Sequence, residues 1–194
     1  MDQDKEKKRQ VIRNAAAELF AHKGFENTTT RDISNAAGMS KGAPYYYFES
    51  KEDLLFQILN ENGSRGLKRI KEIKKSDLSL KDKLKAILEF YMEHYTVYLN
   101  EMKLFVDEQK SLSPEHREIL RKKEREYERA VISILDSLKE QGQIMNFNTT
   151  VTAFAFFGMA NWIYRWYNPE GQVKIPELLE IFQHIFTKGI YTDK

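Results

Sequence analysis

The sequence contains no cysteine, which excludes disulfides, thiolate metal sites and cysteine nucleophiles. Proline and glycine are scarce, at four and nine of 194 residues, and this favours long helices over a β fold with many turns. The longest apolar stretch, residues 151–163, is shorter than the roughly 20 residues that a membrane span needs. The first nine residues are mostly charged and contain no apolar signal-peptide core. We therefore expect a cytoplasmic protein that makes no membrane contact.

A strong charge imbalance is also lacking, because the formal net charge of the chain is only +2. Residues 1–51 hold nine Lys or Arg and seven Asp or Glu, which is the bias of an ordinary solvated surface. Charge alone therefore decides nothing about nucleic-acid binding. Hydrophobic residues make up 41% of the chain, which is enough to bury a core and argues against intrinsic disorder.

Sequence signals of catalysis are missing as well. No Gly-rich phosphate loop or nucleophile elbow is present, and acidic pairs resemble solvated helix charge. The four histidines show no metal-ligand spacing; they are His22, His94, His116 and His184. We therefore expect neither an enzyme nor a metal site nor a cofactor.

Apolar residues recur at helical spacing along the whole chain and predict an all-α fold of about nine helices. Gly24 is placed to end the first helix, and Gly38 to end a second helix of barely two turns. A third short helix is expected over residues 45–48. A long fourth helix follows, in which Gly63 and Gly66 would permit a bend. N-capping residues stand at the start of four expected helices: Thr29 before the second, Ser50 before the fourth, Ser79 before the fifth and Ser113 before the seventh.

The first three helices follow the plan of a helix-turn-helix, in which a second short helix enters the major groove of DNA. Residues 40–47 of the third segment supply a lysine, a glycine and three successive tyrosines. Successive residues on a helix point in different directions, so at least one tyrosine should face solvent. The alternative interpretation is a small helical hairpin whose aromatic residues all serve packing.

Residues 29–42, 45–48 and 51–54 resemble the N-terminal motif of the TetR family, in register across residues 9–60. The rest of the chain resembles the family only in the number, length and order of its helices. The resemblance implies a DNA-binding domain over residues 1–50 and an effector-binding and dimerisation domain over residues 51–194. It also implies a ligand-responsive transcriptional regulator, most simply a repressor that binds a palindromic operator as a dimer.

By this resemblance, Thr30 and Arg31 would reach phosphate or a base, while Tyr47 and Lys51 would hold phosphates. The groove-facing residues would be Lys41, Gly42, Ala43, Tyr45 and Tyr46. Two departures from the family pattern matter. Ala43 lacks the hydroxyl of the frequent threonine, and Pro44 disfavours the helical region for Ala43, so the reading helix should begin slightly late.

The resemblance places a homodimer interface on two helices near residues 149–167 and 175–191. The first is apolar on nearly every face, which is unusual for a surface helix. Alternatively, both helices are simply core. A two-fold dimer would suit DNA, because two reading helices must meet major grooves about 34 Å apart.

An effector site is expected among aromatic residues of the second domain, because tyrosine hydroxyls need partners when they are buried. The candidate effector-binding residues are Tyr91, Tyr95, Phe105, Tyr127, Phe157, Trp162, Arg165 and Trp166. The stretch around Arg165 resembles TetR-like regulators that respond to acyl-CoA thioesters, and Arg165 could pair with a phosphate or carboxylate. The alternative is that Arg165 stacks on Trp162 or Trp166 as a cation–π contact.

Effector binding would pivot the fourth helix near its glycines and change the spacing of the two DNA-binding domains. A different class of function, a helical adaptor that binds only protein, requires the helix-turn-helix pattern to be accidental.

Overall fold

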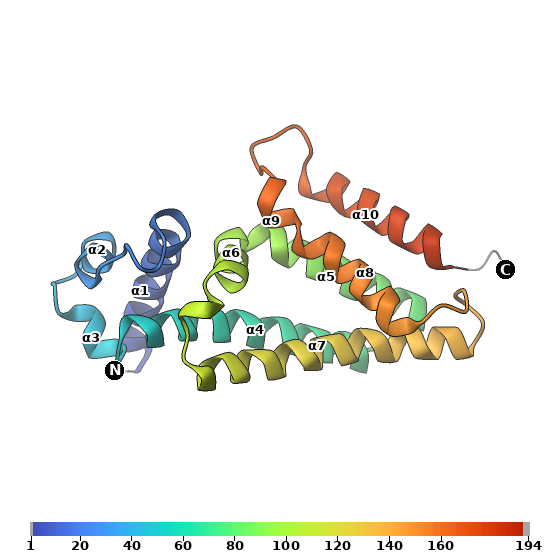
Figure 1. Ribbon diagram of the computed structural model, residues 1–194, viewed down its shortest axis with the longest axis horizontal. Coiled ribbons are helices and arrows are strands. Elements are labelled where there is room, and N and C mark those ends of the chain that lie inside the picture. The colour runs from blue at the N-terminus through green and yellow to red at the C-terminus, as the bar shows by residue number, and fades with distance from the viewer. Residues whose placement is uncertain (1, 192–194) are drawn as a thin grey trace. The chain divides into compact units, whose positions relative to one another are not determined.

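A computed structural model describes residues 2–191 of the chain (Figure 1). The described residues form helices joined by loops, with one isolated β-bridge between Ile144 and Tyr191, so the all-α prediction is confirmed. The helices are α1 Asp2–Lys23, α2 Thr30–Ala36, α3 Ala43–Tyr47, α4 Lys51–Lys75, α5 Leu80–Val97, α6 Leu99–Asp107, the 3₁₀ turn η1 Gln109–Ser111, α7 Pro114–Glu140, α8 Thr149–Asn161, α9 Ile163–Trp166 and α10 Ile175–Ile190. Over residues 2–191, no helix has both the length and the apolar character needed to cross a bilayer.

The chain divides into two compact units, and both α4 and α7 contribute to each of them. The first unit extends through Gly63 and also includes Asn100–Arg121, and the second consists of Ser64–Leu99 and the chain from Lys122 onward. The first unit therefore contains the first half of α4, most of α6 and the start of α7. The expected boundary between the DNA-binding and the effector-binding domain, after residue 50, remains a prediction. The two compact units divide the chain at other positions, after residues 63, 99 and 121.

The core of the first unit gathers around α1, whose inward stripe contains Ile12, Ala16 and Phe20. Helix α2 packs on α1 and α3 packs on α2 (Figure 1). Fully or nearly buried residues from α4 and from the α6–α7 region complete this core; they are Leu54, Leu55, Ile58, Leu59, Leu104, Leu112 and Leu120. Several short or partial helices thus share one hydrophobic interior with α1.

The core of the second unit gathers around α5, which packs against α8, α9 and α10. Helix α4 contributes Ile70 and Ile73 to this core. The inward residues of α7 are Val131, Ile134, Leu135 and Leu138, at the 3–4 residue spacing of one helix face. These buried residues are the ones that the hydrophobic periodicity of the sequence predicts.

The predicted helix ends are confirmed in detail. Gly24 has φ +86° and Gly38 has φ +65°, the left-handed conformation that ends a helix at low cost only for glycine. Thr29 and Asp32 form a reciprocal capping box. Lys23 hydrogen-bonds to Asp32 at 2.7 Å and, together with the capping contacts of Thr29, lowers the pKa of that carboxyl. Ser113 caps α7, whose first residue is Pro114.

Two expectations about helix limits are wrong. Helix α3 begins at Ala43, not Tyr45, because Pro44 occupies the first turn, where its missing N–H and fixed φ are tolerated. The expected helix over residues 149–167 breaks at Trp162 into α8 and α9. Helix α4, by contrast, runs without interruption from Lys51 to Lys75, so its glycines do not divide it.

Gly24→Ala should lower the free energy of unfolding by about 1–2 kcal/mol, because a Cβ is disfavoured in the left-handed region. Thermal or denaturant unfolding monitored by circular dichroism would measure the loss. The control is His22→Ala, an exposed position in the last turn of α1. Equal stability of the two variants would contradict the prediction.

Candidate nucleic-acid interface and effector site

The turn between α2 and α3 is held by backbone and hydroxyl contacts. The amide of Met39 donates to the carbonyl of Ser34 at 2.9 Å, directly after Gly38. The fully buried Ser34 hydroxyl lies 2.8 Å from the carbonyl of Thr30 and 3.1 Å from that of Lys41. A small hydroxyl side chain here therefore sets both how closely the two helices approach and where the reading segment begins.

Helix α3 separates its residues into a buried and an exposed side. Pro44 and Phe48 are buried and anchor α3 to the core, as predicted for Phe48. Tyr45 and Tyr46 retain 59% and 76% of their accessible surface, and Lys41 and Gly42 are also exposed. The hairpin alternative required these tyrosines to serve packing, and their exposure removes its main support.

The remaining residues predicted to contact DNA lie around this exposed side. Thr30 is half-buried, and its hydroxyl lies 3.2 Å from the hydroxyl of Tyr45, so the structure brings the start of α2 to α3. Arg31 is exposed, while Ala43 and Tyr47 are half-buried. The Tyr46 and Tyr47 rings meet edge to face, with centroids 5.1 Å apart.

Lys51 has a different environment from the one its expected phosphate contact requires. Its ammonium group lies 2.8 Å from the carbonyl of Phe25 and 3.1 Å from that of Thr28, with the carbonyl of Glu26 at 3.4 Å. It also lies 4.3 Å from the centroid of the Phe25 ring. An ammonium group has three donors, and these carbonyls occupy them. Lys51 thus ties the α1–α2 loop to α4, and we leave it out of the phosphate-binding set.

Arg9 is a residue that the sequence analysis missed. Its guanidinium donates to the carbonyl of Tyr47 at 2.7 Å, hydrogen-bonds to Gln57 and lies 4.8 Å from the centroid of the Phe48 ring. Arg9 therefore stabilises the C-terminal end of α3 by binding its last backbone carbonyl. The sequence contains no signal for this contact, because 38 residues separate Arg9 from Tyr47.

The second unit holds a cluster of aromatic side chains centred on Tyr91. Its ring contacts those of Tyr95, Tyr127 and Phe157, with centroids 4.9–5.3 Å apart. Its hydroxyl lies 2.7 Å from Oδ1 of Asn161 and 3.3 Å from the hydroxyl of Tyr95. Four of the eight predicted effector residues therefore lie together, and Asn161 joins them as a polar partner that the sequence analysis did not select.

Burial keeps the phenols of this cluster protonated. It raises the pKa of Tyr95 to about 12 and also raises the pKa values of Tyr91 and Tyr127. Tyr91 and Tyr127 nevertheless retain part of their accessible surface. The three phenols are therefore neutral groups in a weakly hydrated environment, and two of them keep some accessible surface.

The other four predicted effector residues lie outside this cluster. Phe105 belongs to the first unit and packs against its core. Trp162 and Trp166 are 58% and 49% exposed. The Arg165 guanidinium lies 5.0 Å from the ring centroid of Trp162, so the cation–π alternative describes its contact in this chain.

Two buried polar side chains had no sequence signal that separated them from core residues. His94 in the second unit is 7% exposed, and its ring has no hydrogen-bond partner among residues 2–191. Burial, and secondarily Arg65, lower its pKa to about 4, so it is neutral at physiological pH. Asn62 in the first unit is 3% exposed, and neither polar atom of its side-chain amide has a partner in the described chain.

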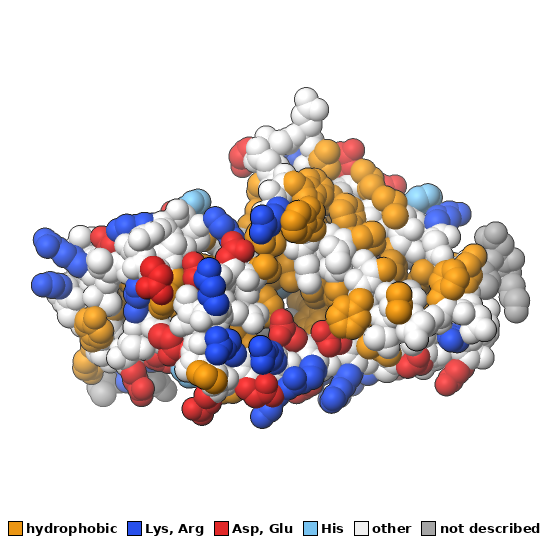
Figure 2. Space-filling model, viewed as in Figure 1, with side chains coloured by type: hydrophobic (Ala, Val, Ile, Leu, Met, Phe, Trp, Pro, Cys, Tyr) orange, Lys and Arg blue, Asp and Glu red, His pale blue; other side chains and the backbone are white. Residues whose placement is uncertain are grey.

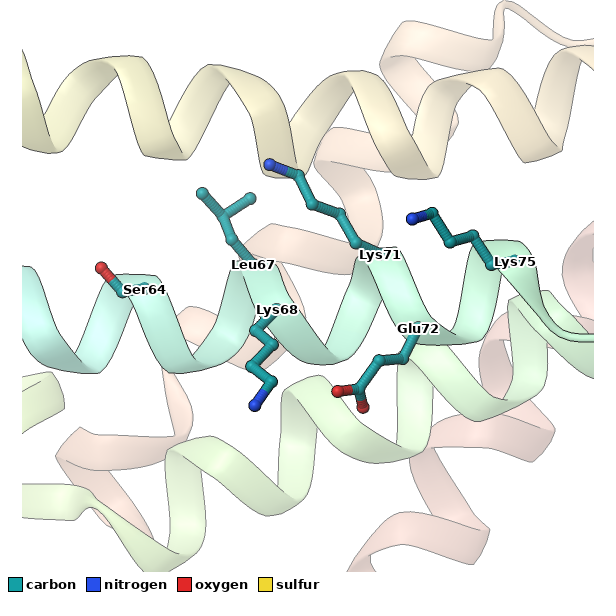
Figure 3. Close-up of a pocket in the computed structure, with 6 residues that line it drawn as sticks. All are labelled: Ser64, Leu67, Lys68, Lys71, Glu72 and Lys75. Carbon is teal, nitrogen blue, oxygen red and sulfur yellow. The ribbon is translucent and has the colours of Figure 1, made fainter.

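An open hollow of 460 Å³ follows the second half of α4 (Figure 3). Figure 3 shows Lys71 and Lys75 extending from one side of the helix and Lys68 and Glu72 from the other. Lys71 forms an ion pair with Glu126 at 3.0 Å. These lysines are exposed and mixed with acids, which describes a solvated helix face better than an anion site.

Helices α8 and α10 expose an apolar surface, which we call the α8/α10 face (Figure 2). Its exposed members are Val151 (67%), Phe154 (50%), Ile181 (45%) and Ile185 (58%). A second hollow of 460 Å³ lies beside them and is lined by residues of both helices. In the single chain this face is uncovered, although a helix that is apolar on nearly every face is unusual at a protein surface.

Comparison with known proteins covers both ends of the chain. Residues 12–58 match the family model of bacterial regulatory proteins of the tetR family, and residues 77–190 match that of the tetracyclin repressor-like C-terminal domain. The HTH-type transcriptional repressor KstR2 of Rhodococcus jostii is 28% identical over 94% of this chain and 91% of its own length. The fatty acid metabolism regulator protein of Bacillus subtilis is 29% identical over 73% of this chain and 71% of its own.

Among solved structures, AibR in complex with isovaleryl coenzyme A and operator DNA has a similar fold. Its TM-score is 0.83 and its identity 24%, over 92% of this chain and 97% of AibR. The C-terminal match alone spans more than half of the chain, and the exposed reading helix lies within the N-terminal match. The chain belongs to the TetR family of bacterial transcriptional regulators.

Proposed function

We propose that the protein is a cytoplasmic repressor that binds a palindromic operator as a homodimer and releases it when a small amphipathic effector binds. The exposure of Tyr45 and Tyr46 on a helix anchored by Pro44 and Phe48 carries this proposal. A structural helix of five residues gains nothing from two solvated phenols, whereas a reading helix needs polar tips that reach base edges. The repressor role also follows the name of its relative KstR2.

The reading surface divides its contacts between bases and phosphates. Lys41, Tyr45 and Tyr46 have the exposure and length to reach base edges, and the bare backbone of Gly42 allows close approach. Ala43 would offer its methyl group to a thymine methyl. The flanking residues Thr30, Arg31 and Tyr47 would contact phosphates that position the helix. The protein-only adaptor, the competing function, gives these exposed polar residues no role.

A second copy of the chain is the natural partner for the α8/α10 face. Monomeric proteins rarely expose large contiguous apolar patches, and helices that pair about a two-fold axis cover such a face with its own duplicate. A two-fold dimer also presents two reading helices to one duplex. We therefore assign the homodimer interface to α8 and α10, near residues 149–167 and 175–191.

The effector that fits best is an acyl-CoA thioester, which combines an apolar chain with an anionic nucleotide. The tyrosine cluster is a mainly aromatic environment with few polar groups, which suits an acyl chain and its carbonyl. Arg165, with exposed Trp162 and Trp166, would meet the anionic and planar parts. The relative named for fatty acid metabolism is consistent with this class.

Lys41→Ala and Lys51→Met form a matched pair that separates reading from scaffolding. Lys41→Ala should weaken binding to a duplex selected from a random pool by about tenfold and reduce its preference over scrambled DNA, with an unchanged Tm. Lys51→Met should lower the unfolding free energy by about 1–3 kcal/mol, because the part-buried carbonyls of Phe25 and Thr28 lose the ammonium donor, and should keep the preference. Fluorescence anisotropy and thermal unfolding measure both effects.

The opposite pattern, an unchanged Tm and altered DNA affinity in Lys51→Met, would return Lys51 to the phosphate contacts. Wild-type affinity should also fall steeply as salt rises, since phosphate contacts release counterions. Salt-independent binding would favour the adaptor.

Placing a charge on the α8/α10 face should dissociate the dimer. Ile185→Asp is expected to give a folded monomer by light scattering, because the carboxylate would be buried without a partner in the interface. Affinity for the palindromic duplex should fall at least about tenfold, since the two reading helices are no longer linked. Leu78→Asp is the control, because Leu78 is 46% exposed but lies outside the face. A dimeric Ile185→Asp variant would refute this interface.

Native mass spectrometry of freshly purified protein should reveal a bound acyl-CoA, and added octanoyl-CoA should release the selected duplex. Arg165→Gln should weaken octanoyl-CoA binding about tenfold and leave octanoate binding unchanged, because only the thioester carries phosphates. Release by octanoate but not by octanoyl-CoA would place the effector in another class.

A further inference from the structure

Gly66 is in close contact with an aromatic ring, unlike the helical glycines Gly158 and Gly189. A Cβ built on Gly66 would lie 2.9 Å from Cε2 and 3.3 Å from the hydroxyl oxygen of Tyr127. At Gly158 and Gly189 the same atom would meet nothing within 4 Å. The Tyr127 ring therefore rests directly on the backbone of α4, and an added methyl group would displace it. This contact explains why glycine suits position 66 of an unbroken helix.

The same ring connects α4 to the aromatic cluster. Its centroid lies 5.3 Å from that of Tyr91, whose hydroxyl is hydrogen-bonded to Asn161. Tyr91 and Tyr95 satisfy their hydroxyls within the cluster, but the Tyr127 hydroxyl has no partner among the described residues. Because burial raises the pKa of Tyr127, the group stays a neutral O–H donor at physiological pH. A weakly hydrated phenol that keeps some accessible surface and has no partner in the described chain is a donor available to a ligand.

We propose that the Tyr127 hydroxyl donates a hydrogen bond to an acceptor oxygen of the effector, and that its ring transmits effector binding to α4 through Gly66. This inference rests on the proposed effector-dependent function and names the acceptor as a carbonyl, such as that of a thioester. A ring pressed toward Gly66 by a ligand would push on the α4 backbone directly, since no side chain separates them.

Helix α4 is suited to carry the displacement because it is continuous. It supplies Ile70 and Ile73 to the core of the second unit. Its first half supplies Leu54 and Leu55 to the core of the first unit, against which α1–α3 pack, so that core must accommodate a shift of α4 at residue 66. Coupling of this kind typically changes affinity by about 5–150-fold, and it acts equally in both directions.

A double-mutant cycle without effector tests the contact. Gly66→Ala should weaken binding to the selected duplex about tenfold in the wild-type background, because its methyl group displaces the Tyr127 ring. In the Tyr127→Leu background the same change should alter affinity less than about twofold. Thermal unfolding of each variant shows that the protein is folded. An equal effect of Gly66→Ala in both backgrounds, or no effect in either, would overturn the proposal.

Tyr127→Phe tests the hydroxyl separately, because it keeps the ring on Gly66. Duplex affinity without effector should be unchanged, octanoyl-CoA should bind about tenfold more weakly, and the ratio of octanoyl-CoA affinities with and without duplex should move toward one. A merely structural role of Tyr127 would leave that ratio unchanged, and this result would overturn the proposal.

The two experiments distinguish this inference from the proposed effector class. If octanoyl-CoA fails to bind the wild type, the acyl-CoA assignment is wrong, and the cycle without effector decides the Gly66–Tyr127 contact by itself. If octanoyl-CoA binds and the cycle shows no coupling, the effector class stands and the transmission route is wrong.

Discussion

A single helix whose apolar stripe must satisfy two hydrophobic cores is the constraint on which the molecule depends. The first half of α4 buries Leu54, Leu55 and Leu59 with the DNA-reading helices, and its second half buries Ile70 and Ile73 with the effector-binding helices. Each buried aliphatic side chain contributes about 1.5–3 kcal/mol, so neither half can leave its core cheaply. The proposed regulation would use this one continuous element, because it takes part in both cores.

The side chains of the reading surface can face solvent because other side chains of the protein hold its backbone in place. Ser34, Arg9 and Lys51 all bind main-chain carbonyls of the helix-turn-helix or of the loop before it. With these carbonyls satisfied inside the protein, Lys41 and Tyr46 remain exposed, as their proposed contacts with DNA require. A stable backbone with exposed polar side chains suits pre-organised recognition. Few side chains or loops then have to become ordered on binding, so the entropy cost of binding is small.

In the second unit, by contrast, the polar groups lie among aromatic side chains and not on an exposed surface. Tyr91, Tyr95 and Asn161 satisfy one another in an apolar interior, while Tyr127 and His94 keep side-chain polar atoms without partners in the described chain. Groups of this kind reduce stability unless something else completes their hydrogen bonds. A ligand that does so would be favoured by the hydrogen bonds that it completes, and the proposed contact of Tyr127 with Gly66 would link its binding to α4.

The all-α fold, most helix ends, the core stripes and an exposed reading helix could be predicted from the amino-acid sequence, since helical periodicity and capping are local properties. The sequence also suggested the tyrosine cluster, of which Tyr91 and Tyr95 are four residues apart on one helix. Folding in three dimensions was needed to show that Lys51 holds the α1–α2 loop, that Arg9 supports α3, that Phe105 lies apart from the cluster and that Gly66 contacts Tyr127. The contacts of Lys51, Arg9 and Gly66 join residues far apart in the chain, and no local pattern encodes which distant side chain fills a given space.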